Sequence, residues 1–152
     1  KKKLNVKLYP GFKNKSFRED KRWLEFDPTL KICKENSNIW DLIQKSRLVV
    51  HSYDSTGILE TLSLNIPTLA FWQNDFDHLT EDVRADYQML ADVGIIHLSP
   101  KSAANKINDI WNDIDSWWNN SDTQNARRKF CDKFAKDCNH PAQTLTSLLI
   151  DK

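Results

Sequence analysis

The chain has 152 residues, of which 39% are hydrophobic and 28% are charged, and its formal net charge is +1. This length and composition allow one full hydrophobic core, so they predict a single globular domain and exclude a disordered chain. The basic run at residues 1–3 is short and terminal, and the net charge is close to zero, which argues against nucleic acid as a partner. No apolar run approaches the ~20 residues that cross a bilayer. No signal-peptide core follows the basic start, so we expect a cytoplasmic protein without a transmembrane segment.

The N-terminal part of the sequence shows short strand and helix patterns. Residues 4–9 predict a strand, and residues 13–27 carry a short helix or a loop. Residues 29–33 predict a second, weaker strand. A helix then starts at residues 36–38, an Asn-Ser-Asn signal, and its apolar positions are Ile39, Trp40, Leu42 and Ile43. Because the chain starts without Met inside a predicted strand, we expect it to be a fragment of a longer protein.

The central part alternates more clearly. Residues 47–51 predict a strand that is apolar at consecutive positions, which is typical of a strand covered on both faces in a parallel sheet. A helix with Ile58, Leu59, Leu62 and Leu64 follows, and Asn65 and Pro67 end it.

The second half repeats the alternation and then becomes helical. Residues 68–72 predict another buried strand, and the loop 73–79 leads into a helix over residues 80–93. Gly94 ends that helix before a strand at residues 95–98. From Pro100 onward the pattern is helical throughout.

Strands that alternate with helices at this spacing predict an α/β fold. We expect a doubly wound, Rossmann-like, mostly parallel sheet of about five strands, with helices at the C-terminal end. Residues 1–152 would then form one α/β domain.

An apolar stripe with two tryptophans marks the first C-terminal helices. Its members recur at steps of three and four residues: Ala103, Ile107, Ile110, Trp111, Ile114 and Trp118. A helix lying on a membrane would carry Lys and Arg on its other face, whereas this one carries Asn and Asp. The stripe is therefore predicted to face the core or another domain.

Small and polar residues crowd the turn after the strand at 47–51. They are Ser52, Asp54, Ser55, Thr56 and Gly57. In an open parallel sheet, ligands bind outside the carboxyl ends of the strands, where a following helix presents free backbone N–H groups. Small side chains and hydroxyls at that place predict a cradle for a diphosphate. The alternative is that Asp54, Ser55 and Thr56 only cap the helix.

Two further residues near this turn are candidates. Glu60 lies four residues after Thr56, so it can face the same cleft and grip ribose hydroxyls, or it can simply favour the helix dipole. His51 ends the strand and is the best candidate for proton transfer or phosphate pairing, the alternative being a packed, hydrogen-bonded histidine. His97, at the end of a later strand, is a weaker candidate, and His78 and His140 are expected at the surface.

At these residues the sequence resembles a known enzyme class. Residues 41–72, DLIQKSRLVVHSYDSTGILETLSLNIPTLAFW, look like the donor-binding half of GT-B glycosyltransferases, with Glu60 and Pro67 seven positions apart. Residues 80–111 are similar to the segment of that fold in which a helix near the donor sugar ends at a Gly and is followed by a strand and a long helix. The closest resemblance is to a bacterial family of transferases for surface carbohydrate synthesis, through Ser46-Arg47, Tyr53-Asp54, Leu59-Glu60-Thr61, Asn65-Ile66-Pro67, Gly94-Ile95-Ile96-His97 and Trp117-Trp118.

The resemblance implies a nucleotide-sugar-dependent glycosyl transfer. The donor's diphosphate would lie on residues 52–57 and its ribose near Glu60, with Asp82 or Arg84 nearer the transferred group. The chain would be the C-terminal donor-binding part of a two-domain enzyme and inactive without its N-terminal domain. A carbohydrate or lipid-linked acceptor is implied, and no cofactor beyond the nucleotide-sugar substrate.

Other interpretations stay open. Retaining GT-B enzymes commonly carry two Glu eight positions apart, but Ser52 stands eight before Glu60. The alternatives are the corresponding half of a CDP-glycerol-type phosphotransferase, or a nonenzymatic module that binds a nucleotide or a partner. Asp75-Phe76-Asp77 matches a metal-binding triplet of another glycosyltransferase fold, but a hard cation needs more ligands than this loop offers, so we expect no metal site.

Overall fold

The computed structural model describes residues 3–9, 18–73, 75–136 and 140–150. It divides into two compact units, an N-terminal unit (Lys1–Ser46) and a C-terminal unit (Arg47–Lys152), which we describe separately. The expectation that the whole chain is one domain of a longer two-domain protein stays a prediction.

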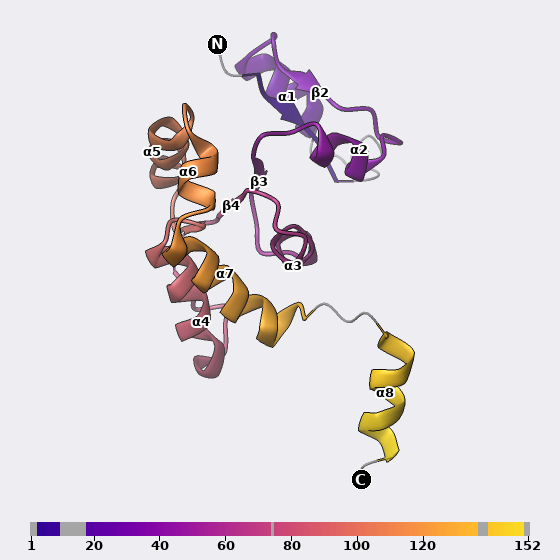
Figure 1. Ribbon diagram of the computed structural model, residues 1–152. Helices are drawn as coiled ribbons and strands as arrows, with labels where there is room; N and C mark the ends of the chain where they lie inside the picture. The colour runs from indigo at the N-terminus through magenta and orange to yellow at the C-terminus, as the bar shows by residue number, and fades with distance from the viewer. Residues whose placement is uncertain (1–2, 10–17, 74, 137–139, 151–152) are drawn as a thin grey trace. The chain divides into compact units, whose positions relative to one another are not determined.

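Among its described residues, the N-terminal unit contains two short strands and two helices (Figure 1). Strands β1 (Asn5–Val6) and β2 (Lys31–Ile32) pair in parallel, and helix α1 (Glu19–Phe26) lies between them in the sequence. Helix α2 (Ile39–Gln44) begins where the sequence predicted, because the Asn38 side-chain oxygen accepts a hydrogen bond from the Trp40 backbone N–H at 2.9 Å. Of the predicted helix or loop at 13–27, residues 13–17 lie outside the described residues.

The C-terminal unit is built on a three-stranded parallel sheet. Its strands are β3 (Val49–His51), β4 (Thr68–Phe71) and β5 (Ile96–His97), in the order β3-β4-β5. Helix α3 (Thr56–Ser63) joins β3 to β4, and α4 (Glu81–Asp92) joins β4 to β5. Gly94 has φ 75°, a conformation that suits glycine, and it separates α4 from β5 as predicted.

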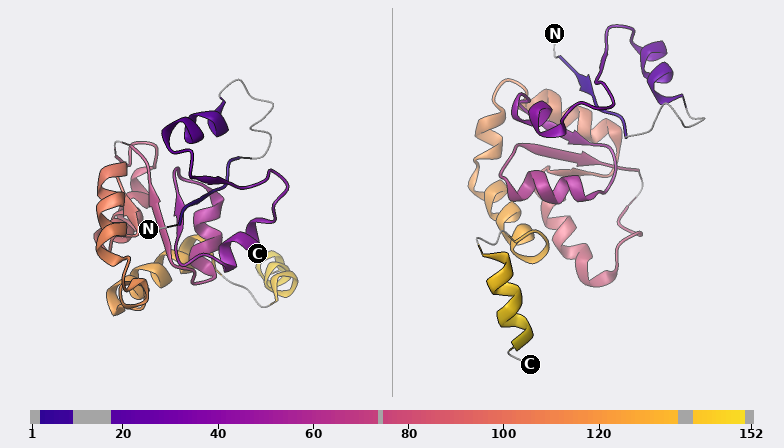
Figure 2. Two further views of the ribbon diagram at one scale, coloured as in Figure 1. Left: turned by 90° about the horizontal axis from the view of Figure 1, so that it is seen from above. Right: turned by 90° about the vertical axis from the view of Figure 1, so that its right-hand side faces the viewer.

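Strand β4 is the centre of this sheet. Thr68, Leu69 and Ala70 are all fully buried although their side chains point to alternate faces. Helix α5 (Pro100–Ile110) lies on one side of the sheet and α3 and α4 lie on the other (Figure 2, right). Helices on both faces explain why consecutive positions of the strand are apolar or buried.

The predicted class is confirmed, but the single sheet of about five strands is corrected. The strands are parallel, yet they form one sheet of two strands and one of three. In β1 and β2 an exposed polar residue, Asn5 or Lys31, precedes a half-buried apolar one. Such strands lack the apolar residues on both faces that an inner strand of a covered sheet carries.

The C-terminal helices carry the predicted stripe, but in two pieces. Helix α5 ends at Ile110 and α6 (Ile114–Trp118) starts anew, because the Asp113 carboxylate accepts a hydrogen bond from the Ser116 N–H at 3.0 Å. The stripe faces inward as expected: Ala103, Ile110, Ile114 and Trp118 are buried.

Helix α7 (Ser121–Phe134) packs against α3 and α4. Its Phe130 lies in the hydrophobic core that these three helices share. Helix α8 (Pro141–Ile150) follows. Among the described residues, none of the helices has the length and apolar character that crossing a membrane requires.

Candidate functional site

The three parallel strands of the C-terminal unit end at one edge of the sheet. Strand β3 leads there into residues 52–55 and then α3, and β4 leads into residues 72–80 and then α4. The register pairs His51 with Ala70 and Phe71 with His97, so the two connections start side by side. This edge is where open parallel sheets bind ligands.

The start of α3 lacks a side-chain cap. Its N-cap residue is Ser55, which is extended at φ −150° and ψ 161°, and its hydroxyl accepts no hydrogen bond from the first turn. A capping side chain closes the first turn of α2, α5, α6 and α7, through Asn38, Ser99, Asp113 and Asn120. Helices α1 and α4 resemble α3 in having no side-chain cap. Within the described part of the chain, the backbone N–H groups of Thr56 and Gly57 have no partner.

Gly57 lies against the ring of His51. A Cβ atom on Gly57 would come within 3.0 Å of His51 Cε1 and 3.4 Å of its Nδ1. The small residue at this position therefore makes room for an imidazole. The sequence interpretation was that Gly57 leaves space for a phosphate. Packing against His51 is an alternative reason for a glycine at this position.

His51 itself is packed and hydrogen-bonded. Its Nε2 lies 3.3 Å from the Thr61 hydroxyl, which in turn donates to the Gly57 carbonyl at 3.0 Å. Because the hydroxyl proton is used there, the His51 Nε2–H donates to the hydroxyl oxygen. Burial lowers the pKa of His51, which favours the neutral ring. A role of His51 in proton transfer stays a prediction.

Asp54 joins the two connections at the sheet edge. Its Oδ2 lies 3.2 Å from His78 Nε2 on the loop after β4, and its Oδ1 accepts a hydrogen bond of 3.4 Å from the Tyr87 hydroxyl on α4. Burial, with the nearby Asp54 charge, raises the pKa of Tyr87 to about 12, so its hydroxyl keeps the proton that it donates. Trp72 stands edge-on to the His78 ring, at 5.5 Å between centroids and 90° between planes.

The geometry places an open helix start and a carboxylate–imidazole pair at the ligand-binding edge of a parallel sheet. A comparison with protein families matches residues 1–149 to the family described as LIC12162 family transferase. The chain belongs to this family of transferases. Neither a curated protein nor a solved structure matches the chain significantly.

In this LIC12162 family transferase, the other predicted site residues lie on α3 and α4. Ser52, Thr56 and Glu60 are exposed, and the Glu60 carboxylate has no hydrogen-bond partner among the described residues. Asp82, in the first turn of α4, accepts a hydrogen bond from the Thr80 hydroxyl at 2.5 Å, which lowers its pKa. Arg84 Nε donates to the Leu79 carbonyl at 3.3 Å, and an Arg84 terminal nitrogen lies 3.6 Å from Asp77. Arg84 therefore holds the loop after β4.

Sequence reasoning missed the partners of Asp54. His78 was predicted to be a surface residue, and Tyr87 and Thr61 were not singled out as site residues. His78 and Tyr87 stand 24 and 33 positions from Asp54, and no sequence spacing signals such a contact. The one available signal was the position of His78 on a loop after a buried strand, where ligand-binding residues gather.

The loop after β4 also contains the acidic triplet. Asp75 Oδ1 accepts a hydrogen bond from the Asp77 backbone N–H at 2.9 Å, and Phe76 is buried in the core. Among the described residues, no group of three or more His, Cys, Asp or Glu side chains is arranged to hold a metal ion.

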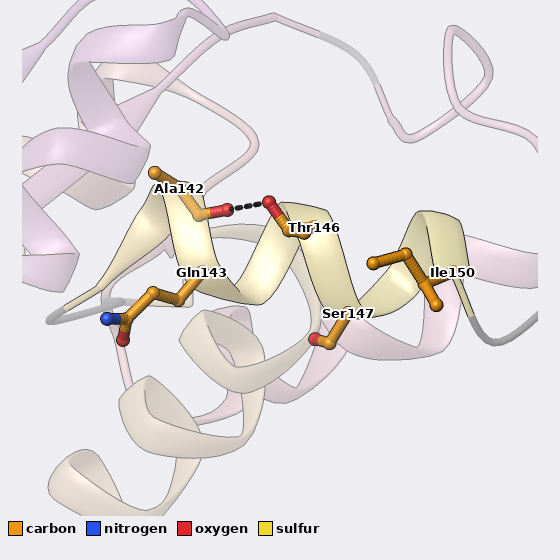
Figure 3. Close-up of a pocket in the computed structure, with 5 residues that line it drawn as sticks. All are labelled: Ala142, Gln143, Thr146, Ser147 and Ile150. Carbon is orange, nitrogen blue, oxygen red and sulfur yellow. Dashed lines mark hydrogen bonds between the residues drawn. The ribbon is translucent and has the colours of Figure 1, made fainter.

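Figure 3 shows a pocket on α8 that is separate from this edge. Five residues line it: Ala142, Gln143, Thr146, Ser147 and Ile150. The Thr146 hydroxyl donates to the Ala142 carbonyl at 2.8 Å, as a hydroxyl often does within its own helix. Every lining group comes from one exposed helix face and none is charged, so this pocket has no chemistry for transfer.

Proposed function

We propose that this chain supplies the nucleotide-donor site of a glycosyltransferase that acts in bacterial surface carbohydrate synthesis. The donor is a nucleotide-activated sugar, and the acceptor is a carbohydrate or a lipid-linked carbohydrate. The diphosphate lies over the first turn of α3, the ribose hydroxyls bind Glu60, and Asp82 and Arg84 lie nearer the transferred group. The membership in a transferase family and the resemblance to GT-B donor domains support this assignment.

The observation that carries the proposal is the open start of α3. Helix N-termini attract anions because their first N–H groups are unsatisfied and the helix dipole adds positive potential. At α3 the N-cap side chain leaves these groups free, and the helix begins directly after a parallel strand. The exposed Glu60 carboxylate is one turn further along the same helix, so it can face a ligand that binds at the helix start.

The test is a proline at the first helical position, Thr56→Pro, in the complete protein. Proline is favoured at this position of a helix and fixes a helical φ, and Ser55 already has the extended backbone that a residue before proline adopts. The change removes one backbone N–H and the hydroxyl while the helix remains. Thr56→Ala removes the hydroxyl alone and is the matched control.

Binding is measured by isothermal titration calorimetry with UDP, CDP and GDP, with the corresponding nucleotide sugars, and with CDP-glycerol. Thr56→Pro should weaken binding of the preferred nucleotide by about 1.5–3 kcal/mol, the range of hydrogen bonds to charged groups, and Thr56→Ala by much less. Equal affinities of wild type and Thr56→Pro would refute the diphosphate site. A preference for CDP-glycerol over every sugar nucleotide would favour the phosphotransferase.

The ribose contact is tested separately with Glu60→Gln. This variant keeps the shape of the side chain but removes the charge, so binding should weaken by about 1–3 kcal/mol. Asp109→Asn on α5 removes one negative charge at an exposed position and is the matched control. If both variants bind equally well, Glu60 does not contact the nucleotide.

A further inference from the structure

The loop after β4 presents a histidine that neither the family assignment nor the sequence interpretation gives a role. His78 is 43% exposed, and its Nε2 lies 3.2 Å from a carboxylate oxygen of Asp54. Asp54 directly precedes Ser55, the N-cap residue of α3. The imidazole therefore contacts a residue that is adjacent in sequence to the helix start, where the diphosphate is proposed to bind.

The hydrogen bond fixes which nitrogen of the ring is available. An ionised carboxylate only accepts hydrogen bonds, so Nε2 of His78 carries the proton that is shared with Asp54. The Trp72 ring stands edge-on to the imidazole, with the two ring centroids 5.5 Å apart. No described residue hydrogen-bonds Nδ1 of His78. The nitrogen that remains is thus open to a ligand.

Both oxygens of Asp54 are already used, because the second accepts the Tyr87 hydroxyl. A carboxylate held in this way is a poor direct partner for an anionic phosphate. It is well suited to orient a histidine and to stabilise a positive charge on it when an anion is bound on the other side.

We propose that His78 is a phosphate-binding residue, and that Asp54 is its positioning residue. In the bound state the imidazole is protonated on both nitrogens: Nε2–H donates to Asp54, and Nδ1–H donates to a phosphate oxygen of the nucleotide. This inference rests on the proposed function, because it names a contact of the same nucleotide site. It moves Asp54 from the ligand-contacting residues to the residues that act through another side chain.

The charged and titratable groups around the imidazole are few. Asp54 lies on the turn after β3, and Tyr87, which donates to Asp54, lies on α4. Asp75 and Asp77 belong to the same loop as His78, and Arg84 on α4 lies 3.6 Å from Asp77. A phosphate added to these groups brings further negative charge to the ring, so nucleotide binding should be coupled to uptake of a proton by His78.

The experiment measures that proton uptake. The complete protein is titrated by calorimetry with inorganic pyrophosphate and with UDP, CDP and GDP at pH 7.5, in two buffers that differ in their ionisation enthalpy. The difference between the observed binding enthalpies gives the number of protons taken up. Wild type should take up a substantial fraction of one proton.

The decisive variant is His78→Gln. The Gln side chain can still donate to Asp54, so the loop keeps its anchor, but it has no second nitrogen to bind a phosphate. We expect the proton uptake to disappear and the affinity to fall about tenfold or more. Asp54→Asn should reduce both quantities in the same direction, because the imidazolium loses its carboxylate. His140→Gln changes an exposed histidine and should change neither.

The outcomes separate the two proposals. If wild type binds pyrophosphate or a nucleotide but His78→Gln keeps both the affinity and the proton uptake, His78 does not contact phosphate and the nucleotide site stands. If wild type binds none of the probes, the proposed function is wrong and the assignment of His78 is wrong with it. Equal thermal stability of His78→Gln and wild type shows that a lost contact, and not unfolding, lowers the affinity.

Discussion

The two ends of helix α3 differ in the hydrogen bonds that they receive from side chains. At the C-terminal end, the Arg127 guanidinium donates to the Leu62 carbonyl at 2.8 Å, and the Trp118 indole N–H donates to the Asn65 carbonyl and side-chain oxygens at 3.1 Å. Gln124 adds a hydrogen bond of 3.0 Å to the same Asn65 side-chain oxygen. At the N-terminal end, the N-cap side chain makes no such bond.

This contrast separates stability from binding. A helix end that is tied to two other helices holds the helix in place, and Trp118 is nearly fully buried there. An end whose N–H groups are left unsatisfied has not been optimised for stability, which is typical of a position kept for a ligand. We therefore expect changes at the C-terminal end of α3 to alter folding, and changes at the N-terminal end to alter binding.

The largest expected effect is from Trp118→Ala. The change removes a large side chain from the core and the hydrogen bonds to Asn65 together, so the free energy of unfolding should fall by about 3–5 kcal/mol. Chemical denaturation measures this loss. Trp23→Ala on α1 is the control, because Trp23 is 40% exposed, and it should change the value far less. Equal losses from the two variants would contradict the importance assigned to this end of α3.

Arg127→Met should have a smaller effect of the same kind. The Leu62 carbonyl would lose its guanidinium donor but keep the bond from the Asn65 backbone N–H at 3.0 Å, so the expected loss is about 1 kcal/mol. Arg128→Met is the matched control, since Arg128 is exposed and should contribute within about 0.5 kcal/mol. The nucleotide affinity of both variants should equal that of wild type when it is measured under conditions in which the proteins are fully folded.

The smallest effect, Gly57→Ala, tests whether Gly57 serves packing or binding. If no side chain lay close to this position, an alanine would raise the free energy of unfolding by about 0.4–1 kcal/mol, because it reduces the conformational entropy of the unfolded chain. The close approach to His51 opposes this gain, so we expect no stabilisation or a loss of up to about 1 kcal/mol. In a His51→Ala background the same change should become stabilising. A stabilising effect in both backgrounds would show that the His51 ring does not restrict this position.

Local sequence signals predicted the elements of the C-terminal unit well. The helix expected at 80–93 is Glu81–Asp92, and Gly94 follows it with a positive φ. This prediction succeeded because a cap glycine and a periodic apolar face can both be recognised from residues that are close in sequence. The start of α2 at Asn38 was predicted for the same reason. The parallel sheet followed from the apolar run at residues 47–51 and the alternation of elements. The expectation that this strand is covered on both faces was wrong, because Val50 in β3 is 40% exposed and the buried strand is β4.

What the sequence did not reveal depends on contacts between distant residues. The apolar stripe continues with helical spacing across residues 111–113, which concealed the break that Asp113 makes. The two-residue length of β1 and β2, and their pairing with each other in a two-stranded sheet, are set by contacts between distant residues and not by local pattern. The link from Asp54 to His78 and Tyr87 requires three segments to meet, and the composition of the turn alone does not reveal it.

The most direct test of the nucleotide site compares the two ends of α3 in one NMR titration. Isotope-labelled protein is titrated with the nucleoside diphosphate that binds best, and the backbone amide shifts are followed along the helix. We expect large downfield shifts at Thr56 and Gly57, because their amides would donate to a phosphate, and small shifts at Leu64 and Asn65. Shifts confined to the C-terminal end, or the absence of shifts at Thr56 and Gly57 in a saturated complex, would contradict it.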